Sequence, residues 1–167
     1  MDAAIERLKG DVDEESWIKP LLLLVEYSLT DRSNPNFIAQ DRSLHLEHIL
    51  PRKYSSFKEW AHFSVAAEKY LHTIGNMTLL SGKKNVEASN NPFVVKIPIY
   101  KGMGKHDKKM EGASAFLVTQ KLLEQVVGSR EPEWTEALLT ERRDWLYARI
   151  ENILNIELLP KKLRNTA

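Results

Sequence analysis

The side chains best suited to catalysis gather in residues 46–51, where Glu47 and His48 stand side by side and Pro51 follows. A carboxylate is a hard oxygen ligand that suits Mg²⁺, and a neutral imidazole can take a proton from water near neutral pH. Adjacent side chains of a strand point to opposite faces, so these two neighbours can have separate tasks. Hydrolysis of a phosphodiester bond needs both tasks close together, which makes this run a candidate site for that reaction.

Two asparagines further along the chain could complete such a site. Asn85 offers a carbonyl oxygen, a neutral ligand that leaves a bound ion its positive charge, and Asn76 could tie backbone groups of a loop together through its amide. Lys83 and Lys84 stand beside Asn85 and are expected to contact phosphate. Lys96 either contacts phosphate as well or buries its aliphatic stem on a helix face.

These residues belong to runs that resemble the C-terminal domain of GmrSD-type modification-dependent restriction enzymes. That family lies within the His-Asn-His (HNH), or ββα-metal, nucleases. The matching positions are 47–51, 74–81, Asn85, 89–93 and Lys96, and the resemblance extends over roughly residues 44–154. Three separate segments coincide in the expected order, which is far more specific than any one short match.

The resemblance implies a role for each residue of the site. His48 is the general base, Glu47 and Asn85 hold Mg²⁺ or Mn²⁺, and Asn76 braces the loop. It also implies DNA as the substrate, a setting in defence against foreign DNA, and an N-terminal domain or subunit that hydrolyses nucleotides and controls cleavage. No glycine-rich phosphate loop occurs in this sequence, so we expect the chain to be the nuclease part of a larger protein or to act beside a separate partner.

The expected fold is α+β, with the ββα-metal (HNH) motif embedded in a mainly helical domain. Hydrophobic periodicity and turn residues predict a strand that ends before Pro51, a second strand at 77–80, and helices at 14–29, 64–72, 91–96, 115–127 and 134–156. Gly75 should close the second helix, and Pro98 should stop or kink the third. On the last helix, residues 141–144 should be largely solvated.

Length and composition indicate one domain without covalent cross-links. The chain has 167 residues, 43% of them hydrophobic, and no cysteine, which excludes disulfides, thiolate nucleophiles and cysteine-rich zinc sites. We expect an N-terminal helical extension at 1–42, the nuclease domain with its C-terminal helices at 43–157, and a tail at 158–167. The net charge of +1 gives no overall indication of a nucleic-acid partner. No apolar run is long enough for a membrane span, so a cytoplasmic location is expected.

Other interpretations of the same residues remain open. His45 could be an auxiliary metal ligand or an ordinary polar strand residue, whereas a zinc-protease cluster of His45, Glu47 and His48 has the wrong spacing for the helical motifs. His62, His72 and His106 are expected to be surface or packing residues. The lysine-rich loop 101–112 could clamp DNA or be solvated. The alternative function is a catalytically inactive nucleic-acid-binding or assembly module that keeps the scaffold.

Overall fold

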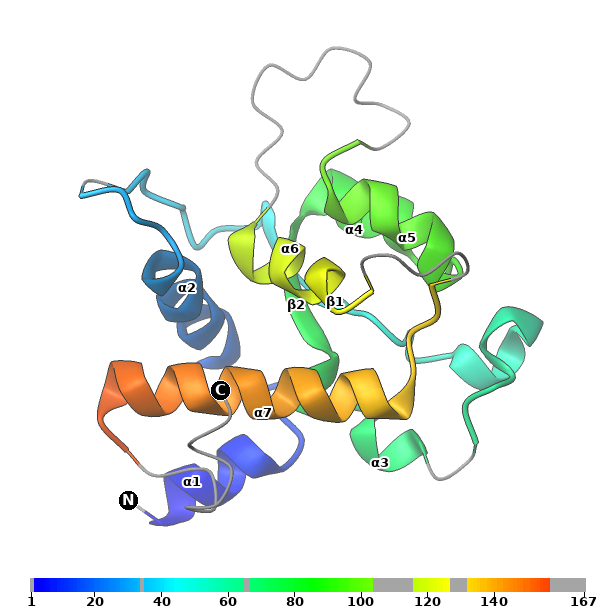
Figure 1. Cartoon of the computed structure of the whole chain (residues 1–167), viewed down its shortest axis with the longest axis horizontal. Helices are drawn as coiled ribbons and strands as arrows, with labels where there is room; N and C mark the ends of the chain where they lie inside the picture. The colour runs from blue at the N-terminus through cyan, green and yellow to red at the C-terminus, as the bar shows by residue number, and fades with distance from the viewer. Residues whose placement is uncertain (1, 34, 65–66, 104–115, 127–131, 157–167) are drawn as a thin grey trace.

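The structure is a computed structural model that describes residues 2–33, 35–64, 67–103, 116–126 and 132–156. Helices surround a small two-stranded ribbon (Figure 1). The elements are α1 (Asp2–Lys9), α2 (Ile18–Ser28), β1 (Leu44–His48), the 3-10 helices η1 (Tyr54–Ser56) and η2 (Lys58–Trp60), α3 (Glu68–Leu71), η4 (Ile74–Asn76), β2 (Met77–Ser81), α4 (Gly82–Ala88), α5 (Phe93–Tyr100), α6 (Leu117–Glu124) and α7 (Glu136–Leu154). A mainly helical α+β fold is therefore confirmed.

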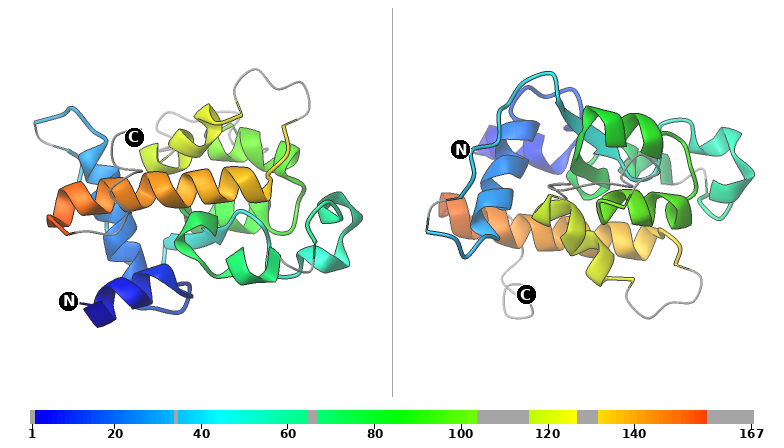
Figure 2. Two further views of the ribbon diagram at one scale, coloured as in Figure 1. Left: turned by 60° about the horizontal axis from the view of Figure 1, so that its bottom comes forward. Right: turned by 90° about the horizontal axis from the view of Figure 1, so that it is seen from above.

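Strands β1 and β2 form an antiparallel ribbon in which Glu47 faces Thr78 and His48 faces Met77 across the ladder. A two-stranded ribbon is marginal on its own and needs a packed face. Met77 and Leu79 pack into a cluster with α2 and α7, whereas Leu80 packs into a second cluster with α5. Helices therefore cover the ribbon from both sides, with α7 crossing the molecule (Figure 2).

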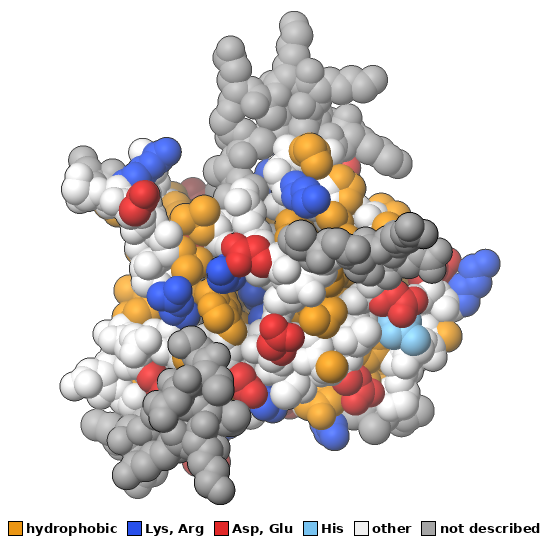
Figure 3. Space-filling model, viewed as in Figure 1, with side chains coloured by type: hydrophobic (Ala, Val, Ile, Leu, Met, Phe, Trp, Pro, Cys, Tyr) orange, Lys and Arg blue, Asp and Glu red, His pale blue; other side chains and the backbone are white. Residues whose placement is uncertain are grey.

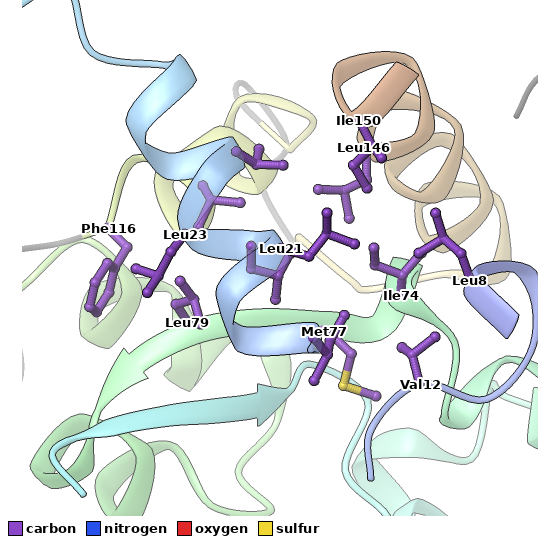
Figure 4. Close-up of a cluster of buried hydrophobic side chains, with 14 of the residues drawn as sticks. Leu8, Val12, Leu21, Leu23, Ile74, Met77, Leu79, Phe116, Leu146 and Ile150 are labelled. Carbon is purple, nitrogen blue, oxygen red and sulfur yellow. The ribbon is translucent and has the colours of Figure 1, made fainter. Parts of the chain in front are cut away.

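The first cluster joins the N-terminal segment to the ribbon. Leu8, at the end of α1, and Val12, just after it, are buried together with Ile74 and Met77, as Figure 4 shows. Leu146 and Ile150 of α7 close the same cluster, and α2 contributes leucines from above. Helices α1 and α2 and the segment between them, which fall in the expected extension at 1–42, thus share a core with the strands that carry the candidate site.

The N-terminal helices differ from the prediction at 14–29. Helix α2 begins only at Ile18, with Pro20 in its first turn, where a missing N–H costs nothing. Helix α1 was not predicted. Glu26 of α2 accepts the N–H groups of Leu117 and Val118 at 3.0 and 2.8 Å and so caps the first turn of α6.

Helix α7 lies close to its predicted range, but its predicted solvated face was partly wrong. Thr135 caps its start and Asn155, in the left-handed region at φ 51°, ends it. Arg142 is only 1% exposed, and its Nη2 donates to the carbonyl of Met77, to Thr78 Oγ1 and to the carbonyl of Val118, each at 3.2 Å. The helical periodicity of the sequence could not predict that the Arg142 guanidinium is buried against β2.

Two further boundaries needed correction. Pro98 lies inside α5 and does not stop it, since the helix continues for two more residues to Tyr100. Burial of Phe93, Ile99 and Tyr100 stabilises the helix despite the proline. Gly75 does not close a helix but lies in η4, where a Cβ atom would stand 2.6 Å from the carbonyl oxygen of Leu139. Glycine therefore permits η4 to approach the backbone of α7.

Some predicted segments fall outside the described residues. These are positions 104–112 of the lysine-rich loop, including His106, and the tail at 158–167. Helix α6 occupies the middle of the predicted range 115–127. Among the described helices, none combines the length and apolar character needed to cross a membrane.

Candidate functional site

His48, the last residue of β1, lies beside a buried carboxylate from the N-terminal segment. Its Nε2 is 3.3 Å from Oδ2 of Asp13, whose side chain is 5% exposed. The same oxygen lies 2.8 Å from Nδ1 of His72 and 2.5 Å from Nη2 of Arg52. One carboxylate oxygen thus joins two imidazoles and a guanidinium, which we call the Asp13 cluster.

The core packing of the N-terminal segment places Asp13 in this cluster. Val12 is fully buried, and its N–H donates to the carbonyl of His72 at 2.9 Å. That backbone bond lines up the segment after α1 with the segment before η4. Backbone pairing therefore brings Asp13 and His72 close together, independently of the contact between their side chains.

Asn76, fully buried, holds the segments that carry His48 and His72. Its Oδ1 accepts the N–H of Leu50 at 2.7 Å, and its Nδ2 donates to the carbonyls of Leu50 and Leu71 at 2.9 and 2.8 Å. Leu50 lies two residues after His48, and Leu71 directly precedes His72. The amide fixes both imidazoles through their backbones.

The pKa values of His48 and of Asp13 are both lowered within the Asp13 cluster. Burial, and after it the charge of Arg52, lowers the pKa of His48 to about 4, although Asp13 opposes the shift. Burial would raise the pKa of the Asp13 carboxyl, but the hydrogen bond from His72 and the nearby positive charges bring it below its ordinary value. At neutral pH the cluster therefore holds an ionised carboxylate beside a neutral His48.

Glu47 lies on the opposite face of β1 and has different partners. Its Oε1 accepts from Lys96 Nζ at 2.7 Å and from the hydroxyl of Tyr100 at 3.0 Å, both on α5. Burial raises the pKa of Glu47 and lowers the pKa of Lys96, and the attraction between them opposes both shifts. Glu47 and His48 are thus separated by the alternation of the strand.

The ammonium group of Lys96 has no N–H donor free for a phosphate. The side chain is 0% exposed, and Nζ donates to Glu47 and to the carbonyls of His48 and Ile49 at 2.7, 2.9 and 3.1 Å. An ammonium has three donors, and all are used. The expected phosphate contact does not fit this arrangement, whereas the alternative of a buried stem does.

The other expected site residues lie on or beside α4. Asn85 Oδ1 and Lys84 Nζ are buried, and within the described residues neither has a hydrogen-bond partner. Lys83 is exposed. The ring of His45 lies 3.0 Å from the carbonyl of Arg42, and a Cβ at Gly82 would approach its Nε2 to 3.0 Å.

The Asp13 cluster has donors that could hold a metal ion. One ligand atom each from Asp13, His48 and His72 lies within 4.8 Å of the others, and the described residues contain no further group of this kind. His48 Nε2 is also buried without a hydrogen-bond partner, although Asp13 stands nearby. Carboxylate oxygen and imidazole nitrogen are both ordinary ligands of divalent ions, so these residues fit a cation.

Sequence reasoning missed Asp13, Arg52 and the role of His72. His72 was expected to be a surface or packing residue, yet it contacts Asp13. His62 follows that expectation, since it is exposed and its Nε2 lies 2.8 Å from the carbonyl of Trp134. No motif spacing links Asp13 to His48, 35 positions apart in the printed sequence. The only available signal was an acidic residue next to an apolar Val12.

Comparison with protein families identifies the family of this chain. Residues 1–149 match the family model described as GmrSD restriction endonucleases, C-terminal domain. Comparison with curated proteins and with solved structures gives no match. The family match begins at the N-terminus and therefore includes Asp13, beyond the range 44–154 over which the motifs were recognised.

Proposed function

Since this chain belongs to the family of GmrSD restriction endonuclease C-terminal domains, we propose that it is a metal-dependent, HNH-type DNA endonuclease that hydrolyses phosphodiester bonds. The observation that carries the proposal is the position of His48: a neutral imidazole at the end of β1, with Nε2 3.3 Å from an ionised, buried carboxylate. A family of restriction endonucleases implies DNA as the substrate and a divalent metal.

The order and packing of the elements support the HNH assignment. Strand β1, strand β2 and helix α4 occur in this order along the chain, with η1, η2, α3 and η4 between the two strands, and ββα is the order of this nuclease class. Asn76, the last residue of η4, stands directly before β2 and braces the turn after His48. These features agree with the roles that the sequence motifs imply for both residues.

In the proposed mechanism, His48 accepts the proton of the attacking water. Its low pKa keeps it neutral, and therefore able to accept a proton, across the physiological range. Asp13 orients the ring and stabilises the imidazolium that forms. Arg52 is half exposed beside Asp13 and is placed to bind a phosphate oxygen, and the negative charge of that phosphate would offset the effect of Arg52 on His48.

The divalent ion, Mg²⁺ or Mn²⁺, would stabilise negative charge on the scissile phosphate when bound. Asp13 and His72 offer donors beside His48. Asn85, expected from the motifs, has an unpaired buried Oδ1 that suits a cation, but Glu47 already accepts from Lys96 and Tyr100. Lys83 remains the exposed lysine of α4 that could contact the DNA backbone.

The test is cleavage of supercoiled plasmid with Mg²⁺ or Mn²⁺, comparing wild type, His48→Ala and the matched control His62→Ala. Removing the general base should lower the cleavage rate by about 10²–10⁴-fold. The His62 variant should cut like wild type because its imidazole lies outside the Asp13 cluster. Cleavage at the wild-type rate by His48→Ala would refute the assignment.

The alternative of a catalytically inactive nucleic-acid-binding module has less support. On the face that Figure 3 shows, the coloured acidic and basic side chains are interspersed, and no broad basic patch gathers there. A binding module without catalysis would need such a surface for phosphate contacts. Metal-dependent cleavage separates the two functions, because the module would bind DNA and leave it intact.

The same proposal has three further parts. The chain acts on modified DNA, it restricts foreign DNA within the cytoplasm, and a nucleotide-hydrolysing domain or subunit controls it. Their support is the family membership and the sequence resemblance. Comparing cleavage of modified and unmodified plasmid checks the first of them directly. Equal rates on the two substrates would remove it and leave the nuclease assignment standing.

A further inference from the structure

The Asp13 cluster contains two imidazoles, and the proposed mechanism uses only one. His48 must keep one ring nitrogen unprotonated if it is to accept a proton. His72 has no such task, and its Nδ1 lies 2.8 Å from Asp13 Oδ2, nearer than Nε2 of His48 at 3.3 Å. The side chain of His72 is also 33% exposed against 14% for His48, so an ion can reach it from solvent.

The distance between the two donors suits a shared ion. Two ligands in adjacent positions of an octahedral ion, each roughly 2.1 Å from the metal, lie about 3 Å apart. Asp13 Oδ2 and His72 Nδ1 are already at that separation. A cation can therefore replace the proton that the carboxylate and the imidazole share without a change in this separation, although each side chain must turn until its lone pair points at the ion.

We infer that Asp13 and His72 are the protein ligands of the divalent ion, and that this pair prefers a first-row transition-metal ion such as Mn²⁺ over Mg²⁺. The inference rests on the proposed function for the role of the ion, but the binding site stands on its own geometry. An imidazole nitrogen suits transition metals, whereas Mg²⁺ favours oxygen ligands throughout. Glu47, held by Lys96 and Tyr100, is not a ligand in this arrangement.

Binding is measured first without any DNA. Mn²⁺ and Mg²⁺ are titrated into the full chain by calorimetry, for wild type and for Asp13→Asn, His72→Gln and His48→Gln. Asp13→Asn and His72→Gln should each weaken Mn²⁺ binding by at least about tenfold, and His72→Gln should also abolish the preference over Mg²⁺. His48→Gln should retain most of the affinity.

Matched controls come from the same neighbourhood and residue types. Asp11→Asn changes an exposed acid two residues from Asp13, and His62→Gln changes an exposed histidine outside the cluster. Both should bind Mn²⁺ like wild type. Equal loss in the controls, or unchanged Mn²⁺ affinity in both Asp13→Asn and His72→Gln, would overturn the inference.

A measurement on the wild type keeps the test valid where a variant fails to fold. Substoichiometric Mn²⁺ should broaden the imidazole NMR signals of His72 and His48 before that of His62, because a paramagnetic ion acts on nearby nuclei. Equal broadening of all three signals would contradict the site. A chain that binds Mn²⁺ at Asp13 and His72 but never cuts DNA would defeat the proposed function alone, whereas His48-dependent cleavage with binding elsewhere would defeat this inference alone.

Discussion

Replacing Glu47 by glutamine distinguishes a buried ion-pair partner from a metal ligand. The side chains of Glu47 and Lys96 are 5% and 0% exposed, so the variant leaves an ammonium buried without its counter-charge. Loss of one partner of a buried pair costs about 3–5 kcal/mol of unfolding free energy. Lys96 keeps its two bonds to the carbonyls of His48 and Ile49, so we expect the lower end, about 3 kcal/mol.

The assay is urea unfolding in the presence of EDTA, which removes any contribution from bound metal. Glu59→Gln, an exposed acid in η2, is the matched control and should change the unfolding free energy by less than about 0.5 kcal/mol. The double variant Glu47→Gln with Lys96→Met should recover part of the loss, because no buried charge is left over. The two single effects should therefore not add.

The opposite pattern would refute this reasoning. If Glu47→Gln unfolds within about 0.5 kcal/mol of wild type while its Mn²⁺ affinity falls at least about tenfold, Glu47 is a metal ligand and its contact with Lys96 is incidental. That result would also restore the ligand pair expected from the sequence motifs.

Three other changes test the surroundings of the site. The pKa of His48 is about 4 in the folded state and near 6.5 in the unfolded state, so the unfolded state binds the proton first as the pH falls. The unfolding free energy, measured in EDTA, should therefore fall by roughly 3 kcal/mol between pH 6.5 and pH 4. His48→Gln should flatten that slope. Asn76→Ala removes three buried hydrogen bonds and should cost about 3–5 kcal/mol in urea unfolding, so a loss below about 1 kcal/mol would show that the brace is dispensable. Gly75→Ala places a Cβ 2.6 Å from Leu139 O and should lower stability by about 1–3 kcal/mol in calorimetry, whereas an unchanged melting temperature would contradict the close approach to α7.

The sequence was sufficient for the ribbon because its signals are local. Alternating polar and apolar residues mark β1, the apolar run from Met77 marks β2, and the motif order points to the family that the comparison confirms. Helix α7 was predicted from its periodicity for the same reason. Such patterns depend on neighbours within a few positions, which a single sequence displays.

The partners of the site residues could not be predicted, because they depend on long-range packing. Asp13 reaches His48 only because Val12 enters the core beside Met77, and nothing local in either segment records that contact. The pairing of Glu47 with Lys96 follows from how α5 lies against the outer face of β1. A strand pattern shows that neighbours point to opposite faces, but not which side chains cover each face.

The most direct measurement of the central claim is the rate of plasmid cleavage by the purified chain in Mn²⁺, for wild type, His48→Ala and His62→Ala in parallel. We predict metal-dependent nicking by wild type and by His62→Ala, abolished by EDTA, and a rate at least about 10²-fold lower for His48→Ala. Cleavage that survives the loss of His48, or a folded, metal-bound wild-type chain that leaves both modified and unmodified plasmid intact, would contradict the account.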